Sequence, residues 1–152
     1  MFDTFILFVH SWVRWIILIL AIITIFMGLT GMSGNKTFGK AQNAMSAAFL
    51  GSMHLQLLTG LILYLFISPV GYQAFQSDAN VMKEASLRYW AVEHITVMII
   101  AIAVAQIGRV KIKKATEEKA KYKNMLIFNL IALILVLSRI PWDQAGRMFR
   151  GL

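Results

Sequence analysis

The sequence predicts an all-α, four-helix transmembrane bundle that forms a single integral membrane domain over residues 1–152. Of the 152 residues, 59% are hydrophobic and only 14% are charged, which is the balance of a membrane protein. The apolar residues are gathered into four runs, each long enough to cross a bilayer core of roughly 30 Å as a helix. Because most basic residues lie between these runs, the formal charge of +8 indicates membrane orientation and not nucleic-acid binding.

The first two expected spans cover residues 4–29 and 41–67. The first lacks the basic leading region and small-residue cleavage site of a signal peptide, so we expect it to remain in the membrane. A turn-rich segment at 30–40 separates the two spans, and Pro69 and Gly71 end the second. The residues that break the helix in the turn-rich segment are Gly31, Gly34, Asn35 and Gly39.

The third and fourth expected spans cover residues 89–108 and 124–140. The third is bounded by Arg88 and Arg109, and we expect a short interfacial helix over 82–89 to lead into it. A strongly basic segment joins the two spans, and Pro141 ends the fourth. Four spans place both chain termini on the same side of the membrane.

The distribution of Lys and Arg predicts which side that is. The two loops that follow the first and third spans carry nine basic residues, whereas the opposite side carries five. Basic loops remain in the cytoplasm, so we expect both termini on the outer, periplasmic side of a bacterial cytoplasmic membrane. The nine are Lys36, Lys40, Arg109, Lys111, Lys113, Lys114, Lys119, Lys121 and Lys123; the five are Lys83, Arg88, Arg139, Arg147 and Arg150.

Three histidines lie within the expected spans, where ionisable groups are costly and usually face the interior of a bundle. At a helical rise of about 1.5 Å per residue, His10 and His94 lie roughly 9 and 8 Å below the outer ends of their spans. His54 lies roughly 20 Å below the outer end of its own span. Small residues continue the His10 face, which lets helices approach closely or leaves a slot for a flat cofactor.

Two histidines at one depth on different helices meet the requirement for bis-imidazole ligation of a haem iron. His10 with His94 is therefore the first candidate pair, and His54 with His94 is the second. Arg14 and Arg139 are candidates to anchor haem propionates through their forked donors. Glu93 points about 100° away from His94 on the helix, so we expect it to pair with Arg14 or Arg139 rather than with the iron.

Other interpretations of the same residues stay open. The histidines could hydrogen-bond across helices and fix the bundle, or serve another metal or a proton path. A second carboxylate for a di-iron site is missing from the spans, and the absence of Cys excludes disulfides and thiol chemistry. No catalytic motif is present, although an enzyme acting on quinone would need only a slot and a proton donor. We expect the amides Gln56, Gln106 and Asn129 to be buried between helices.

Four short motifs give the chain a family resemblance. They are His-Ser-x-Val-Arg-Trp at 10–15, His-Leu-Gln-Leu-Leu-Thr-Gly-Leu-Ile-Leu-Tyr at 54–64, Arg-Tyr-Trp-Ala-Val-Glu-His at 88–94, and Ile-Pro-Trp at 140–142. Together they resemble the small four-helix membrane proteins of Bacteroidetes-type bacteria that are labelled cytochrome b or cytochrome b-like. The resemblance covers essentially the whole chain. It implies the inner membrane, b-type haem, and His10, His54 and His94 as candidate ligands.

The leading hypothesis is therefore a membrane-integral b-haem electron-transfer protein or respiratory subunit, with quinone as a further expected ligand. The rival is a haem-free structural subunit of a larger membrane complex. A third hypothesis is a lipid- or quinone-binding module without haem. The expected partners are membrane lipid and other membrane subunits or further copies of the chain, and no nucleic acid.

Overall fold

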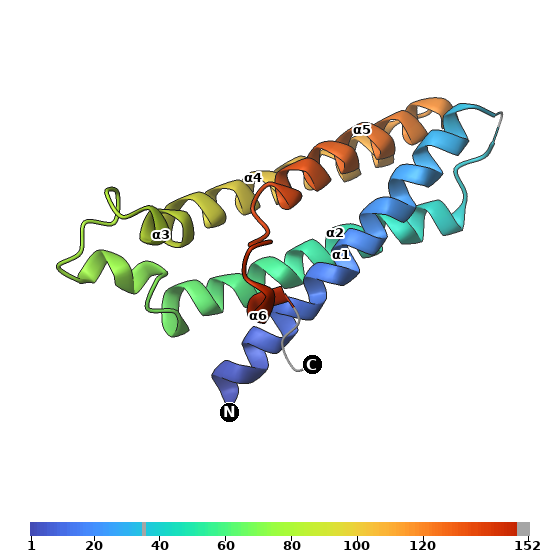
Figure 1. Cartoon of the computed structure of the whole chain (residues 1–152). Helices are drawn as coiled ribbons and strands as arrows, with labels where there is room; N and C mark the ends of the chain where they lie inside the picture. Colours follow the sequence, from blue (N-terminus) through green and yellow to red (C-terminus); the bar gives the residue numbers. More distant parts are fainter. Residues whose placement is uncertain (35, 149–152) are drawn as a thin grey trace.

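The computed structural model describes residues 1–34 and 36–148, apart from the side chain of Ala145; Asn35 and Arg150, both considered above, lie outside the described residues. Four long helices dominate it: α1 (Phe2–Met32), α2 (Lys40–Ile62), α4 (Ile95–Lys114) and α5 (Glu118–Leu137). The described ranges contain no strand. All four helical segments are long and apolar enough to cross a membrane, so the all-helical fold with four possible spans is confirmed (Figure 1).

Short non-α segments extend two of these helices. The α2 helix continues as a π-helix, η1 (Leu63–Ile67), and α4 is preceded by a second π-helix, η3 (Tyr89–His94). A single helical turn, α3 (Ala85–Arg88), leads into η3, where the sequence predicted a short interfacial helix. Two further short elements are the 3₁₀ turn η2 (Tyr72–Gln76) and the C-terminal turn α6 (Ala145–Met148).

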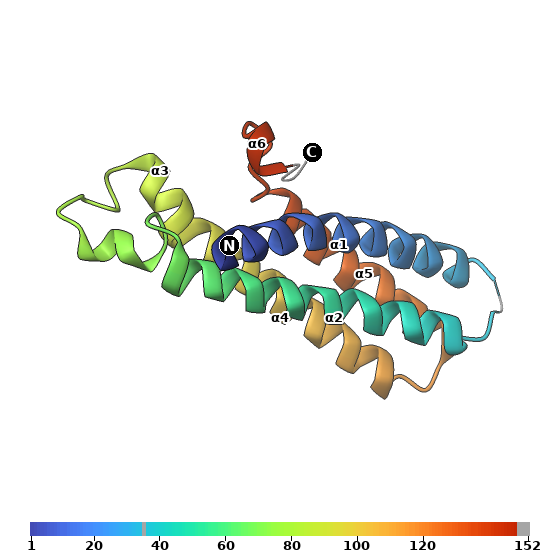
Figure 2. The ribbon, with the colours of Figure 1, turned by 90° about the horizontal axis from the view of Figure 1, so that it is seen from below.

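The helices pack in a ring. The α1 helix packs against α2 and α5, and α4 packs against the same two helices, so α1 and α4 are diagonally opposite. Figure 2 shows the four helices side by side, seen from below the view of Figure 1. The connections at 33–39 and 115–117 lie at one end of the bundle (the loop end), and the connection at 68–84 lies at the other (the η3 end).

The half of the bundle next to the loop end is tightly packed. A Cβ atom added to Gly28 would lie 2.8 Å from Leu126 Cβ, and one added to Gly108 would lie 2.4 Å from Phe128 Cβ. Contacts this short require glycine, because any side chain would push the helices apart. The buried Asn129 amide donates to Thr24 Oγ1 at 2.8 Å, which joins α5 to α1 as the sequence predicted.

The predicted interior face of α1 is buried, including Arg14, Ile17, Ala21, Thr24 and Gly28. Large apolar side chains such as Ile19, Phe26 and Ile134 are exposed on the outside of the bundle, as lipid contact requires. One expected buried amide is not buried: Gln106 is exposed on α4, because it lies on the face opposite Ala101, Ala105 and Gly108. Hydropathy alone does not distinguish the two faces of a helix that is apolar all round.

Candidate functional site

A cavity of about 380 Å³ lies in the half of the bundle next to the η3 end, and both His10 and His94 line it. Its walls come from all four long helices and from the C-terminal segment, and most of its lining is apolar. This volume is within the range of cofactor and small-molecule sites. Because α1 and α4 are diagonal in the ring, the two histidines reach the cavity from opposite sides of the bundle.

The two π-helical segments border this cavity. Residues of η1 and η3, including Tyr64 and Trp90, form part of its wall, and the Tyr64 hydroxyl donates to the Ala91 carbonyl at 2.9 Å. A π-turn is wider than an α-turn and often marks a functional site. Gly60, one turn before η1, lies beside the His10 ring: a Cβ there would be 3.1 Å from His10 Cε1. The backbone therefore makes space next to the imidazole.

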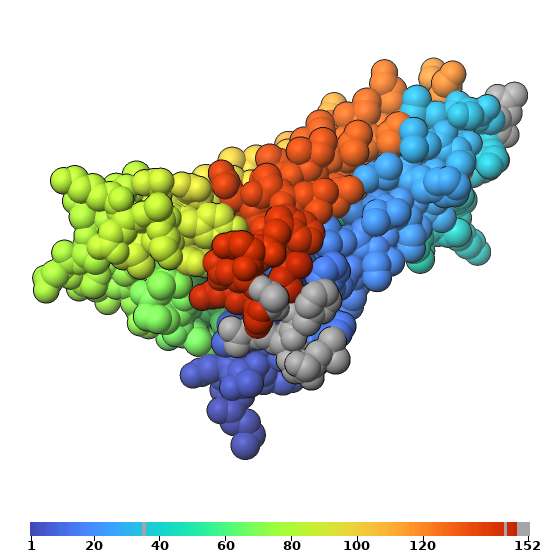
Figure 3. All heavy atoms as spheres, in the orientation of Figure 1, coloured from blue at the N-terminus to red at the C-terminus, as the bar shows by residue number. Residues whose placement is uncertain are grey.

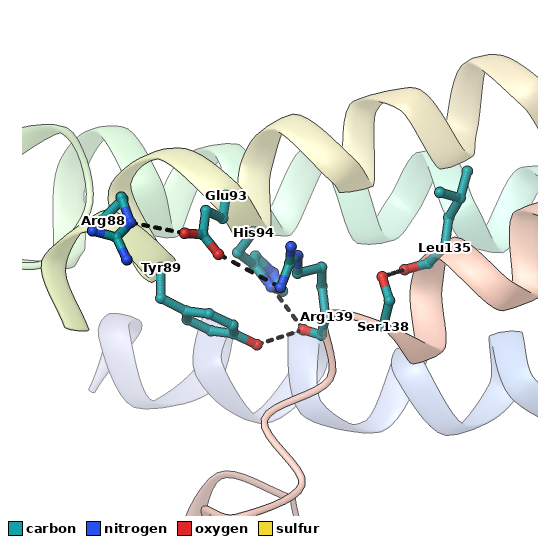
Figure 4. Close-up of polar contacts among 7 residues, drawn as sticks. All are labelled: Arg88, Tyr89, Glu93, His94, Leu135, Ser138 and Arg139. Atoms are coloured by element: carbon teal, nitrogen blue, oxygen red, sulfur yellow. Dashed lines mark hydrogen bonds and ion pairs between the residues drawn. The ribbon is translucent and has the colours of Figure 1, made fainter. Parts of the chain in front are cut away.

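The hydrogen bond at His94 determines which of its ring nitrogens carries the proton. His94 Nδ1 lies 3.0 Å from the carbonyl oxygen of Arg139, which also accepts a hydrogen bond from the Tyr89 hydroxyl at 2.9 Å (Figure 4). A carbonyl oxygen only accepts, so the proton is on Nδ1. In the neutral imidazole, His94 Nε2 then keeps a lone pair that is available to a metal or to a donor.

His10 is held in the same way. Its Nδ1 lies 3.1 Å from Thr59 Oγ1, and that hydroxyl lies 3.1 Å from the carbonyl oxygens of both Leu55 and Gln56. The hydroxyl donates to these carbonyls, so we assign its oxygen as the acceptor of His10 Nδ1–H. In addition, Gln56 Nε2 donates to the His10 carbonyl at 2.9 Å. We therefore assign Nδ1 as a protonated nitrogen in both cavity histidines, and in the neutral form of each ring Nε2 is the nitrogen that can bind a metal.

Three buried polar atoms without a hydrogen-bond partner belong to residues that line the cavity. They are Arg14 Nε, Arg139 Nε and Gln56 Oε1. Arg14 is only 8% exposed, and its Nη2 donates to the backbone carbonyls of Arg147 and Met148 at 2.9 and 3.0 Å. Buried polar atoms are nearly always satisfied, so these three could serve a ligand with polar groups of its own; a fourth such atom, Arg109 Nη1, does not belong to the cavity lining.

Glu93 lies beside the cavity and pairs with two arginines (Figure 4). Its carboxylate is 3.0 Å from Arg88 Nε and 3.5 Å from Arg139 Nη1. The pairing with Arg139 was predicted, whereas Arg14 binds the C-terminal backbone instead. Arg88 was missed as a partner. The five-residue spacing from Arg88 to Glu93 would bring the two together only on a π-helix, and η3 is one.

His54 does not reach this cavity. It is exposed on α2, whereas the adjacent Met53 is buried and lines the cavity. The structure therefore brings His10 and His94 to one site and leaves the second candidate pair, His54 with His94, apart. Sequence reasoning also missed Thr59, Gly60 and Trp90, whose ring centroid is 5.5 Å from that of His94.

The protein groups at the site limit the kind of metal it can hold. Within the described part of the chain, no group of three or more His, Cys, Asp or Glu side chains could hold a metal ion. Two imidazoles suit an iron whose other ligands come from a macrocycle. Comparison of the chain with protein-family models, with curated proteins and with solved structures found no match.

Proposed function

We propose that this protein binds one b-type haem in the cavity, with His10 and His94 as axial ligands, and that it transfers electrons in the membrane. The observation that carries this proposal is that one cavity is lined by two imidazoles, from α1 and from η3 just before α4, each with Nδ1 engaged in a hydrogen bond, so that in the neutral ring Nε2 can bind a metal. This is the ligand state that a metal-bound histidine requires. The proposal includes membership of the cytochrome b-like family that the motifs resemble.

The polar end of the cavity suits the carboxylates of such a cofactor. Arg14 and Arg139 have buried Nε donors without partners, and forked guanidinium groups match carboxylate geometry. Their positive charge would favour the reduced iron and raise its potential. A bound haem would supply one-electron chemistry, and apolar lining residues such as Ile102 and Val136 would limit the contact of water with it.

A reduced-minus-oxidised spectrum of the purified protein, expressed with ample haem, tests the proposal. We expect a b-type spectrum in the wild type that is lost in His10→Leu and in His94→Leu. His54→Leu is the matched control, because it removes an imidazole that does not line the cavity. A colourless wild-type protein, or a spectrum that depends on His54 but not on His10, would refute it.

A haem-free structural role is the second candidate, and one observation favours it. Each cavity histidine already joins two elements of the bundle: His10 bonds Thr59 across α1 and α2, and His94 bonds the Arg139 carbonyl after α5. Such bonds would stabilise the bundle without a cofactor. Co-purification in a stable complex, together with no Soret absorbance, would support this role. The apolar cavity also suits quinone or a lipid, which mass spectrometry of bound lipids would detect.

The orientation in a bacterial cytoplasmic membrane is also part of the proposal. The loop end carries nine basic and only two acidic residues, which supports a cytoplasmic position for it. The chain contains no Cys, so single cysteines can be labelled without interference. In intact cells we expect an impermeant maleimide to label Asp78→Cys. Lys36→Cys should react only after permeabilisation, and the reverse pattern would overturn the orientation.

A further inference from the structure

We propose that the C-terminal strap, residues 141–148, is a closure over the cavity and that a ligand enters and leaves when the strap detaches from α1. This inference goes beyond electron transfer, and it applies to whatever ligand the cavity takes. Three features of the strap support the inference: its hydrogen bonds to α1, its position in the cavity wall and the small number of its side chains that are buried.

One side of the strap is held by three side chains of α1. Ser11 Oγ donates to the Arg147 carbonyl at 3.1 Å, and Trp15 Nε1 donates to the Met148 carbonyl at 3.0 Å. Arg14 Nη2 donates to both carbonyls. Four hydrogen bonds from one stretch of α1 thus converge on two backbone carbonyls. Donors arranged in this way recognise the strap by its backbone, and they satisfy acceptors that a four-residue helix leaves free.

The strap also contacts the opposite wall of the cavity. The Arg147 guanidinium lies over the Trp90 ring of η3, with Cζ 4.4 Å from the ring centroid. Pro141 and Arg147 line the cavity, as do Ser11 and Arg14. The strap therefore runs from α1 to the segment that carries His94 and forms part of the cavity wall. Figure 3 shows the C-terminal segment on the surface of the molecule, across the middle of the bundle.

The attachment is weaker than the packing of the long helices. Among the strap side chains that the structure describes, only Pro141 and Met148 are buried, and Met148 packs in the main core cluster. Segments with few buried apolar contacts open at lower free energy than helices packed along their length. Arg14 also lines the cavity, so an acidic group on an entering ligand would compete with the strap carbonyls for its guanidinium.

The experiment measures access to the cavity without any ligand. A single cysteine replaces Leu57, which lines the cavity on α2, and its modification by a water-soluble maleimide is timed in nanodiscs. In this background, Ser11→Ala with Trp15→Phe removes two of the four hydrogen bonds that hold the strap. We expect modification to become faster by about tenfold or more, since each net hydrogen bond contributes about a factor of two to ten.

A matched control removes two side-chain donors at the loop end of α1. Thr30→Val with Ser33→Ala deletes bonds to the Phe26 and Leu29 carbonyls of the same helix, which do not hold the strap. We expect its modification rate to equal that of the parent. Equal rates in all three proteins, with circular dichroism showing that all are folded, would overturn the closure. This result would leave the haem proposal intact, and a colourless protein would leave the closure intact.

Discussion

Replacing Thr59 by valine is the most direct test of whether Thr59 orients His10 for the haem iron that we propose. Thr59 is buried, at 4% exposed, and its hydroxyl is the acceptor that we assign to His10 Nδ1–H. Valine has nearly the same shape, so the packing around position 59 is kept. The change removes a single oxygen and leaves the imidazole N–H without its partner in an apolar site.

The expected loss of haem affinity in Thr59→Val follows from two independent considerations. Loss of a partner that orients a metal-bound histidine lowers affinity about 10- to 100-fold, which is about 1.4–2.8 kcal/mol. A buried donor left unsatisfied costs about 1–3 kcal/mol, in agreement with the first figure. Donation from Nδ1–H makes the ligand more basic and favours the oxidised iron. If the affinity for haem falls tenfold only when the iron is oxidised, the midpoint potential of the haem rises by about 59 mV.

Two measurements check this prediction: the rate of haem transfer to an excess of a scavenging apoprotein, and a spectroelectrochemical titration. Thr59→Ser keeps the hydroxyl and should restore both the wild-type rate of haem transfer and the wild-type midpoint potential. Thr30→Val is the matched control, because Thr30 Oγ1 makes the same kind of bond to the Phe26 carbonyl of its own helix, at 3.0 Å, and lies at the other end of α1 from His10. A Thr59→Val protein with wild-type haem retention and potential would refute the tautomer assignment.

Two further predictions concern the packed half of the bundle and are measured by reversible unfolding in bicelles. Asn129→Leu removes the bond to Thr24 and should destabilise the protein by about 1 kcal/mol, and an unchanged stability would contradict this interhelical role. Gly108→Ala should cost about 1–3 kcal/mol, because its Cβ would lie 2.4 Å from Phe128 Cβ. Gly51→Ala meets no atom within 4 Å and is the control, which should be neutral or stabilising by up to about 1 kcal/mol.

The number and order of the helices could be predicted because hydropathy and breakers report directly on membrane spans. The helix ends differ from the prediction for a physical reason. The predicted third span ended at residue 108, whereas α4 continues to Lys114. Hydropathy reports only the apolar length, but backbone hydrogen bonding continues through charged turns at the membrane surface. The π-helical segments have no hydropathic signature and could not be found in this way.

The site was only partly predictable. The helical rise predicted that His10 and His94 lie at the same depth in the membrane, and both line the cavity. Depth does not specify a face, however, and α2 carries apolar or small residues on most sides, so His54 could not be excluded. The position of the strap could not be predicted from the sequence. Arg14 and Trp15 bind a backbone carbonyl of the strap, and because every residue has a backbone carbonyl, such a contact does not depend on which residue supplies it. Contacts of this kind become visible only in three dimensions.

The bundle divides into a packed half and a hollow half, and this division would let one short chain hold the proposed ligand without losing stability. Near the loop end, Gly28 and Gly108 let neighbouring helices touch, and Thr24 and Asn129 join α1 to α5. Near the η3 end, two π-helical segments border the cavity, so its space comes from the path of the backbone as well as from small side chains. Removing an imidazole therefore leaves the cavity walls in place. We infer that binding and folding depend on different halves, so histidine variants should lose the ligand and keep the bundle.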